Sequence, residues 1–90
     1  MVVIIPEMLV ELTPQAAVDM EALPNVIHAR VRNVLARLRN WPAVSGAKPL
    51  RGRLAGRFRA RTGDYRVQFY AAGDKIIVEK IGHRDGFYEE

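Results

Sequence analysis

The feature of this sequence that most constrains its fold is a pair of short turns in its second half. Each turn, Thr62–Asp64 and Ala72–Asp74, has a Gly-Asp pair at its centre and lies between strand-like runs. Glycine followed by a small polar residue is typical of tight β-hairpins. The sequence therefore predicts three consecutive antiparallel strands, over Leu54–Arg61, Tyr65–Ala71 and Lys75–Ile81.

The first half predicts one more strand and two helices. A short strand is expected over residues 9–12, and Thr13 is expected to cap a helix that begins with Pro14 and continues to about residue 22. A second helix is predicted over residues 24–40, because its apolar side chains recur at helical spacing and form one stripe. These side chains are Ile27, Val31, Val34, Leu35 and Leu38.

The predicted order is β-α-α-β-β-β, an α+β fold in which a helical hairpin packs on a small, mostly antiparallel sheet. Ninety residues are enough for one domain only. The absence of cysteine excludes disulfides, thiol catalysis and cysteine-based zinc sites, and we expect no metal or cofactor. Met1–Ile5 is too short to span a membrane, so a soluble, cytoplasmic protein is expected.

The net charge of +4 conceals a strong segregation of charge along the chain. Residues 1–23 contain no base, residues 24–40 contain four arginines and no acid, and residues 48–66 contain seven of the 14 bases against one aspartate. Of the 14 bases in the whole chain, 11 are arginine, whose planar guanidinium binds phosphate in a bidentate manner. The pattern favours a polyanionic partner, with nucleic acid ahead of a membrane surface.

The first predicted hairpin concentrates this charge on one of its two faces. Strand alternation places Phe58 and Ala60 on one face and the neighbouring arginines on the other. If Ala60 lies opposite Tyr65, then Arg59 lies opposite Arg66, and like charges in that position cost a few tenths to about 1 kcal/mol per pair. Stability alone does not select this arrangement. A phosphate-binding surface is the favoured interpretation, and a merely solvated basic face is the alternative.

Three segments together resemble the RelE family of bacterial toxins, within the RelE/ParE superfamily. They are Lys48–Gly52, Gly56–Val67 with its Gly-Asp-Tyr-Arg hairpin, and Ile81–Arg84 with the nearby Tyr88. The resemblance covers about residues 8–90, so that Met1–Glu7 would form an N-terminal extension, and it implies a RelE-like fold. It also implies an endoribonuclease that cleaves mRNA in the ribosomal A site and is held inactive by a cognate antitoxin, expected here to carry an acidic segment.

The resemblance also implies roles for individual residues. Tyr88 would serve as the base for attack of the 2′-OH on the adjacent phosphate, because surrounding arginines favour the tyrosinate. Arg84 would stabilise the transition state, and three further arginines would hold the scissile phosphate, two of them at positions where the family's best-known member has lysines. The predicted catalytic set is Tyr88, Arg84, Arg66, Arg59 and Arg57, and the predicted RNA-binding set is Arg51, Arg53, Arg61, Lys48 and His83.

Two other functions remain open at this stage. A ParE-like toxin that inhibits DNA gyrase would have the same fold and would cut no RNA. A catalytically decayed, RNA-binding relative is the third possibility, and the replacement of lysine by arginine at the phosphate site favours it, since arginine is a poor proton acceptor.

Overall fold

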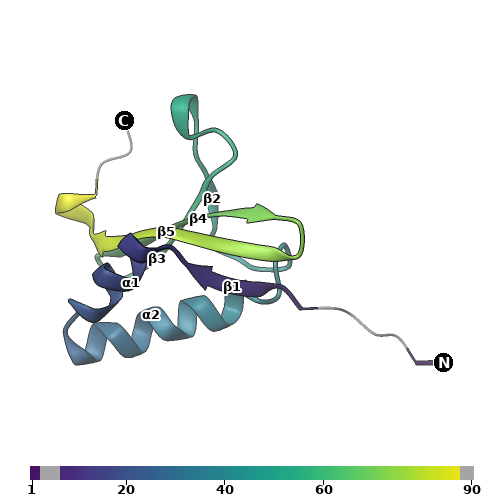
Figure 1. Ribbon diagram of the computed structural model, residues 1–90, viewed down its shortest axis with the longest axis horizontal. Helices are drawn as coiled ribbons and strands as arrows, with labels where there is room; N and C mark the ends of the chain where they lie inside the picture. The colour runs from purple at the N-terminus through teal and green to yellow at the C-terminus, as the bar shows by residue number, and fades with distance from the viewer. Residues whose placement is uncertain (3–6, 88–90) are drawn as a thin grey trace.

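The computed structural model describes residues 1–2 and 7–87, in which two helices cover one face of a five-stranded sheet (Figure 1). The order of the strands across the sheet is β1-β5-β4-β3-β2; β1 pairs with β5 in parallel, and all other neighbours are antiparallel. This arrangement confirms the predicted α+β fold. The strands are β1 (Leu9–Leu12), β2 (Lys48–Pro49), β3 (Phe58–Thr62), β4 (Tyr65–Ala72) and β5 (Lys75–His83).

The helices α1 (Pro14–Glu21) and α2 (Asn25–Leu38) form where the sequence predicts them. The Thr13 hydroxyl accepts a hydrogen bond from the Ala16 amide at 3.1 Å, which is the expected N-cap. The second helix ends two residues earlier than predicted. The three amides that follow the helix, those of residues 39–41, donate to carbonyls three residues back instead of four. This tighter turn ends the helix ahead of Pro42. No helix within the described residues is long and apolar enough to cross a membrane.

The core lies between the helices and the inner face of the sheet. The predicted stripe of α2 packs into it, with Val31 fully buried and Val34 nearly so. From the sheet, Phe69 is fully buried, and the Trp41 ring packs edge-on against it at 5.2 Å and against Phe58 at 4.6 Å. Because side chains alternate along a strand, the residues of β3, β4 and β5 that do not point into this core lie on the opposite face of the sheet.

The predicted pairing of β3 with β4 is wrong by two residues. Ala60 lies opposite Val67 instead of Tyr65, and Arg61, instead of Arg59, lies opposite Arg66. The cause is the turn: Gly63 has a φ of +59° and is the first residue of a two-residue connection, so Thr62 still belongs to the strand. A shift of two residues keeps every side chain on its predicted face, so the separation of apolar from basic side chains is confirmed.

Two further differences affect the segment before β3. Strand β3 begins at Phe58, because Gly52–Leu54 forms a 3-10 turn, η1, in place of the predicted start of the strand. The two-residue strand β2, which the sequence does not predict, pairs with β3 and forms one edge of the sheet. In Figure 1 the teal segment that contains η1 projects away from the sheet.

An irregularity in β5 completes the framework of the site. Gln68 pairs with Lys80 and Phe69 pairs with Val78, so Glu79 is an extra residue, as in a β-bulge. Val78 and Ile81 are both buried in the core. The two residues between them therefore both face away from the helices, on what we call the open face of the sheet.

Candidate nucleic-acid interface

The predicted basic side chains gather along the edge of the sheet that β2 and β3 form. Lys48 lies opposite Arg59, and Arg61 lies opposite Arg66, so like charges meet at two points of the sheet. Arg59, Arg61 and Arg66 line a hollow of about 280 Å³ together with Lys48 and Gly46. The hairpin thus presents several cations toward one concave surface.

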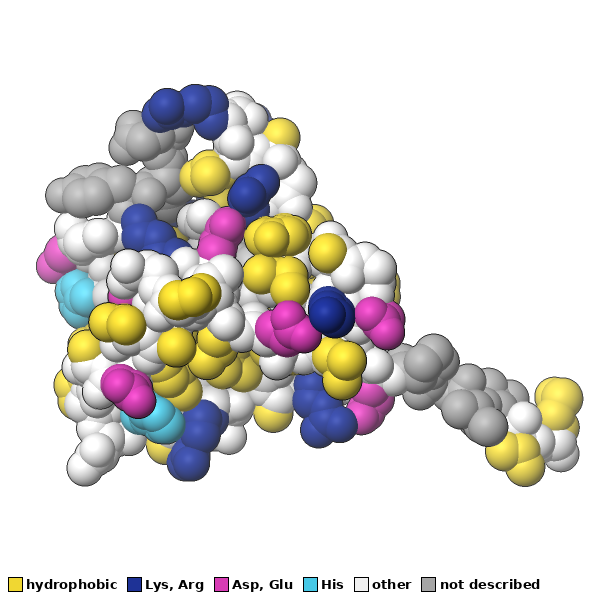
Figure 2. Space-filling model, in the orientation of Figure 1, with side chains coloured by type: hydrophobic (Ala, Val, Ile, Leu, Met, Phe, Trp, Pro, Cys, Tyr) yellow, Lys and Arg dark blue, Asp and Glu magenta, His cyan; other side chains and the backbone are white. Residues whose placement is uncertain are grey.

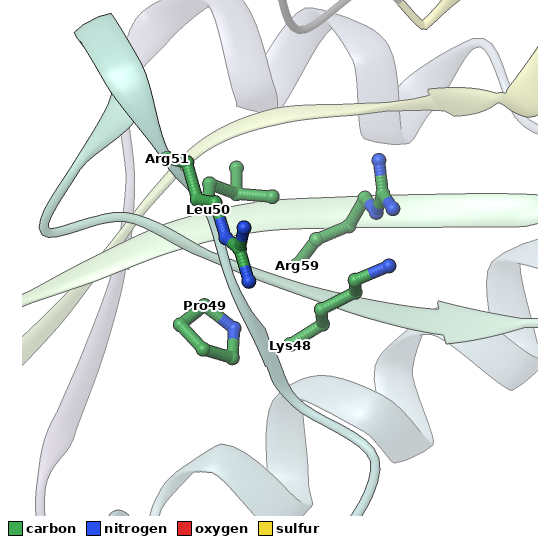
Figure 3. A pocket seen from close by; sticks show the side chains of 5 residues that line it. All are labelled: Lys48, Pro49, Leu50, Arg51 and Arg59. Carbon is green, nitrogen blue, oxygen red and sulfur yellow. The ribbon is translucent and has the colours of Figure 1, made fainter.

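A second, larger hollow adjoins the first, because Lys48 and Arg59 line both. Its volume is about 630 Å³, and Pro49, Leu50 and Arg51 complete its wall (Figure 3). Figure 3 shows the Lys48 and Arg59 side chains extending in the same direction. We call the two hollows together the basic groove, lined by the cations Lys48, Arg51, Arg59, Arg61 and Arg66.

The backbone around η1 holds the wall of the groove in place. The Leu50 amide donates to the Arg57 carbonyl at 2.9 Å, and the Arg57 amide donates to the Leu54 carbonyl at 2.9 Å. Gly52 has a φ of +65°, a conformation that L side chains rarely adopt. Arg53 lies in η1 and is exposed, but it does not line either hollow.

The opposite edge of the molecule differs in character. Figure 2 shows hydrophobic side chains gathered around β1, with acidic and basic side chains interspersed among them. In the same view, Lys and Arg lie at the top, over the projecting segment between β2 and β3. On the sheet, the basic side chains that line the two hollows therefore belong to the β2–β3 side.

Arg57 lies outside the basic groove. Its Nε donates to Glu79 Oε2 at 2.9 Å, and its guanidinium lies 4.9 Å from the centre of the Tyr70 ring. The Gln68 side-chain amide donates to the same Glu79 oxygen at 2.9 Å. This hydrogen bond from Arg57, together with the negative charge of Glu79, raises the pKa of the guanidinium. We call these four residues the Glu79 cluster.

The turn between β3 and β4 brings two predicted catalytic arginines to one place. The Arg66 guanidinium donates from Nη1 to the Gly63 carbonyl at 3.1 Å. The Arg84 amide donates to the Asp64 carbonyl at 2.7 Å, and the Arg84 Nε lies 3.9 Å from the Asp64 carboxylate. Both arginines are thus anchored at the Gly63-Asp64 turn, although Arg84 follows β5 in the chain.

Two predicted residues stand apart from these groups. The His83 ring packs edge-on against Tyr65, with centroids 5.2 Å apart, and His83 Nδ1 accepts a hydrogen bond from the Asp85 amide. Tyr65 alternates with Val67 and Phe69, so this contact lies on the side of the helices. Tyr88 lies outside the described residues.

Sequence reasoning missed the functional potential of Glu79 and Gln68. Glu79 interrupts an apolar run, and the buried residues on either side of the Glu79-Lys80 pair, Val78 and Ile81, are three positions apart instead of two. That spacing is the signal of a bulge, and a bulge turns both intervening side chains to the same face. Within the described residues, no cluster of three acidic or histidine side chains is arranged to hold a metal ion.

Comparison with known sequences gives a family for most of the chain. Residues 10–86 match the family model described as "ParE toxin of type II toxin-antitoxin system, parDE". The match begins in β1 and ends in η2, so it includes the basic groove and the Glu79 cluster. No curated protein gives a significant match to the sequence.

Solved structures share the fold over nearly the whole chain. A chain of the toxin–antitoxin complex RelBE2 from Mycobacterium tuberculosis is 32% identical, with a TM-score of 0.76, over 89% of this chain and 93% of that one. The isolated RelE toxin of E. coli has a TM-score of 0.71 at 16% identity and covers 84% of this chain and 83% of that one. A chain of the archaeal RelE–RelB complex from Pyrococcus horikoshii has a TM-score of 0.67 at 21% identity and covers 89% of this chain and 98% of that one. The last two similarities concern the fold alone.

Proposed function

We propose that this chain, which belongs to the family of ParE toxins of type II toxin–antitoxin systems, is an endoribonuclease that cleaves mRNA on the ribosome. The observation that carries this proposal is the basic groove, in which cations from three neighbouring strands and from the segment after β2 converge on one concave surface. An inhibitor that recognises a protein target needs no such convergence of phosphate-binding groups. A polynucleotide backbone does, because it carries one negative charge per nucleotide.

The opposed arginines of the groove support an anionic ligand. Arg61 and Arg66 are directly opposite in the sheet, and like charges in that geometry are mutually destabilising. A phosphate bound between two such side chains converts the repulsion into two charge-assisted contacts. In this proposal, Lys48, Arg51 and Arg61 bind the RNA backbone on either side of the scissile phosphate, with exposed Arg53 beside them.

The proposed reaction is attack of the 2′-OH on the adjacent phosphorus. The 2′-oxygen forms a bond to phosphorus, the bond to the 5′-oxygen breaks, and the 5′-oxygen takes up a proton from solvent. The products are a 2′,3′-cyclic phosphate and a 5′-hydroxyl. Arg59 and Arg66 neutralise charge on the phosphate, and Arg84, anchored at the same turn as Arg66, stabilises the transition state. Tyr88 is assigned as the base that takes the 2′-OH proton, on the evidence of sequence alone.

We also propose a cognate antitoxin that neutralises the groove. RelBE2 of M. tuberculosis and RelE–RelB of P. horikoshii are toxin–antitoxin complexes, and both contain a chain that resembles this one. An antitoxin for this chain would carry an acidic, extended segment that crosses the basic groove and competes with mRNA there. Both partners would act in the cytoplasm, where translation takes place.

The function is tested by expressing the protein in a bacterium without its antitoxin. We expect growth arrest, and we expect Tyr88→Phe combined with Arg84→Ala to relieve it. Arg32→Ala is a matched control, because Arg32 is exposed on α2, far from the sheet's open face. Persistent arrest in the double variant, at equal protein level, would contradict the proposed chemistry.

A second candidate function is inhibition of DNA gyrase without RNA cleavage. The match to the ParE family favours it. Purified protein would then block DNA supercoiling by gyrase in vitro and leave a translated message intact. Under our proposal the outcomes are reversed: supercoiling proceeds normally, and the message is cut.

A further inference from the structure

The Glu79 cluster places a carboxylate beside the basic side chains of the β3–β4 hairpin. Among the described residues, both hydrogen bonds to the Glu79 carboxylate end on Oε2, one from Arg57 Nε and one from the Gln68 amide, each at 2.9 Å. The Glu79 side chain is 21% exposed and that of Arg57 is 37% exposed. This pair is therefore shielded from solvent on one side and open on the other.

A bulge in the backbone of β5 lies at Glu79. It leaves Glu79 without a partner in β4, and the Glu79 carboxylate accepts a hydrogen bond from Gln68 on the open face. Regular alternation after Val78 would place Glu79 on the open face and Lys80 in the core; the bulge keeps both charged side chains out of the core. Bulges of this kind are enriched near active sites, where they re-aim a side chain.

Gln68 shows that the cluster was not selected for stability alone. The side chain is only 6% exposed, and its carbonyl oxygen is buried without a hydrogen-bond partner among the described residues. A buried acceptor without a partner is destabilising, and an apolar side chain of similar size would avoid that cost. What Gln68 contributes is the hydrogen bond that fixes the Glu79 carboxylate.

We propose that Glu79 is a positioning residue that holds Arg57 ready to bind a phosphate of the RNA substrate. This inference rests on the proposed endoribonuclease function. Glu79 fixes Nε, and the Tyr70 ring lies under the guanidinium plane, so the side chain is held at two points. Within residues 1–2 and 7–87, the hydrogen bond of the Arg57 side chain uses Nε, and its two terminal nitrogens form a fork of four N–H groups that suits phosphate oxygens.

The physical gain is preorganisation. A free arginine side chain has several rotatable bonds, and ordering them on binding costs affinity and rate. A guanidinium that is already ordered binds phosphate without that cost, and small misplacements of such a group reduce rates by up to about a hundredfold. Glu79 also offsets the positive charge of Arg57.

A double-mutant cycle on ribosomes programmed with a defined message tests whether Glu79 acts through Arg57. Glu79→Ala and Arg57→Ala should each reduce the rate of cleavage at saturating message by about tenfold or more. The combined variant should be no slower than Arg57→Ala alone, within about twofold, because the two residues act as one unit. Losses that multiply in the combined variant would mean that Glu79 acts directly on the substrate, and would overturn the proposal.

Conservative variants separate positioning from folding. Glu79→Gln keeps a side-chain oxygen that can accept the hydrogen bond from Arg57, so it should restore most of the rate that Glu79→Ala loses. Glu11→Ala is the matched control, since Glu11 forms an ion pair with Lys75 at 3.1 Å on the other edge of the sheet, and it should leave the rate unchanged. Equal losses in all three variants would indicate a general structural effect and contradict the proposal.

A spectroscopic readout makes the test independent of cleavage. In NMR spectra of the ¹⁵N-labelled protein, the Nε–H signal of Arg57, assigned with Arg57→Lys, should be protected from solvent exchange in the wild type and in Glu79→Gln, and lost in Glu79→Ala. A single-stranded RNA oligonucleotide should shift it. A protected signal that RNA shifts, in a protein that cuts no message, would support the positioning role and overturn the endoribonuclease proposal. A signal indifferent to Glu79 or to RNA would overturn the positioning role.

Discussion

The two faces of the β3–β4 hairpin differ in character: the inner face is apolar, and the open face is basic. On the inner face of β4, Val67 and Phe69 are fully buried, and aromatic rings pack around Phe69. On the open face of the β3–β4 hairpin, Arg61 and Arg66 lie opposite each other. Because the two sets alternate along each strand, the same backbone pairing produces both the core and the charge repulsion. The inner face supplies the core that stabilises the fold, and the open face carries the basic side chains on which the proposed function rests.

The free energy gained by burying apolar side chains on the inner face exceeds the cost of the opposed charges on the open face. Complete burial of a large apolar side chain contributes about 1.5–3 kcal/mol, whereas an opposed like-charge pair costs a few tenths to about 1 kcal/mol. The core can therefore offset the cost of the basic groove. We accordingly expect substitutions on the inner face to change stability and substitutions on the open face to change activity.

The largest effect is expected on the inner face. Phe69→Ala removes a fully buried ring that contacts both Trp41 and Phe58, and should lower the free energy of unfolding by about 3–5 kcal/mol. Urea denaturation followed by tryptophan fluorescence measures this change. A loss below about 1 kcal/mol would mean that the core is not organised around Phe69.

On the open face, the expected loss is one of activity. Arg59 lines both hollows of the groove, so Arg59→Ala should reduce cleavage of a translated message by about a hundredfold while the thermal unfolding temperature stays nearly unchanged. Arg32→Ala removes the same charge from α2 and is the control. Equal rates in the two variants would show that positive charge anywhere on the surface suffices, and that the groove is not the site.

The smallest expected effect has the opposite sign. Arg61→Ala removes one member of the Arg61–Arg66 pair, and should raise the free energy of unfolding by a few tenths to about 1 kcal/mol at low salt. The gain should shrink as salt screens the repulsion in the wild type. A loss of stability at low salt would show that the two arginines do not repel each other in the folded protein.

The sequence predicted those parts of the molecule that depend on local periodicity. Strand alternation assigned Phe58 and Ala60 to the core and their arginine neighbours to the open face, because a period of two leaves no other choice. The helical stripe of α2 was predicted for the same reason. The N-cap at Thr13 was also predicted, since it depends on adjacent residues alone.

The remaining features depend on geometry that a local pattern does not carry. The register of β3 against β4 depended on whether Thr62 belonged to the turn or to the strand, and both choices satisfy the alternation. Strand β2 is too short to show a period. The cluster around Glu79 required a bulge in β5, and its partner Arg57 is 22 residues away in the chain. The predicted base, Tyr88, lies outside the described residues.

The central claim is that the basic face of this sheet cleaves mRNA during translation. Primer-extension mapping of cleavage on a translated message, with purified wild type and Tyr88→Phe, tests it most directly. We predict cuts at fixed codon positions that require ribosomes and that disappear in the variant. An intact message with the wild-type protein, at concentrations that arrest growth, would contradict the claim and point to another target such as gyrase.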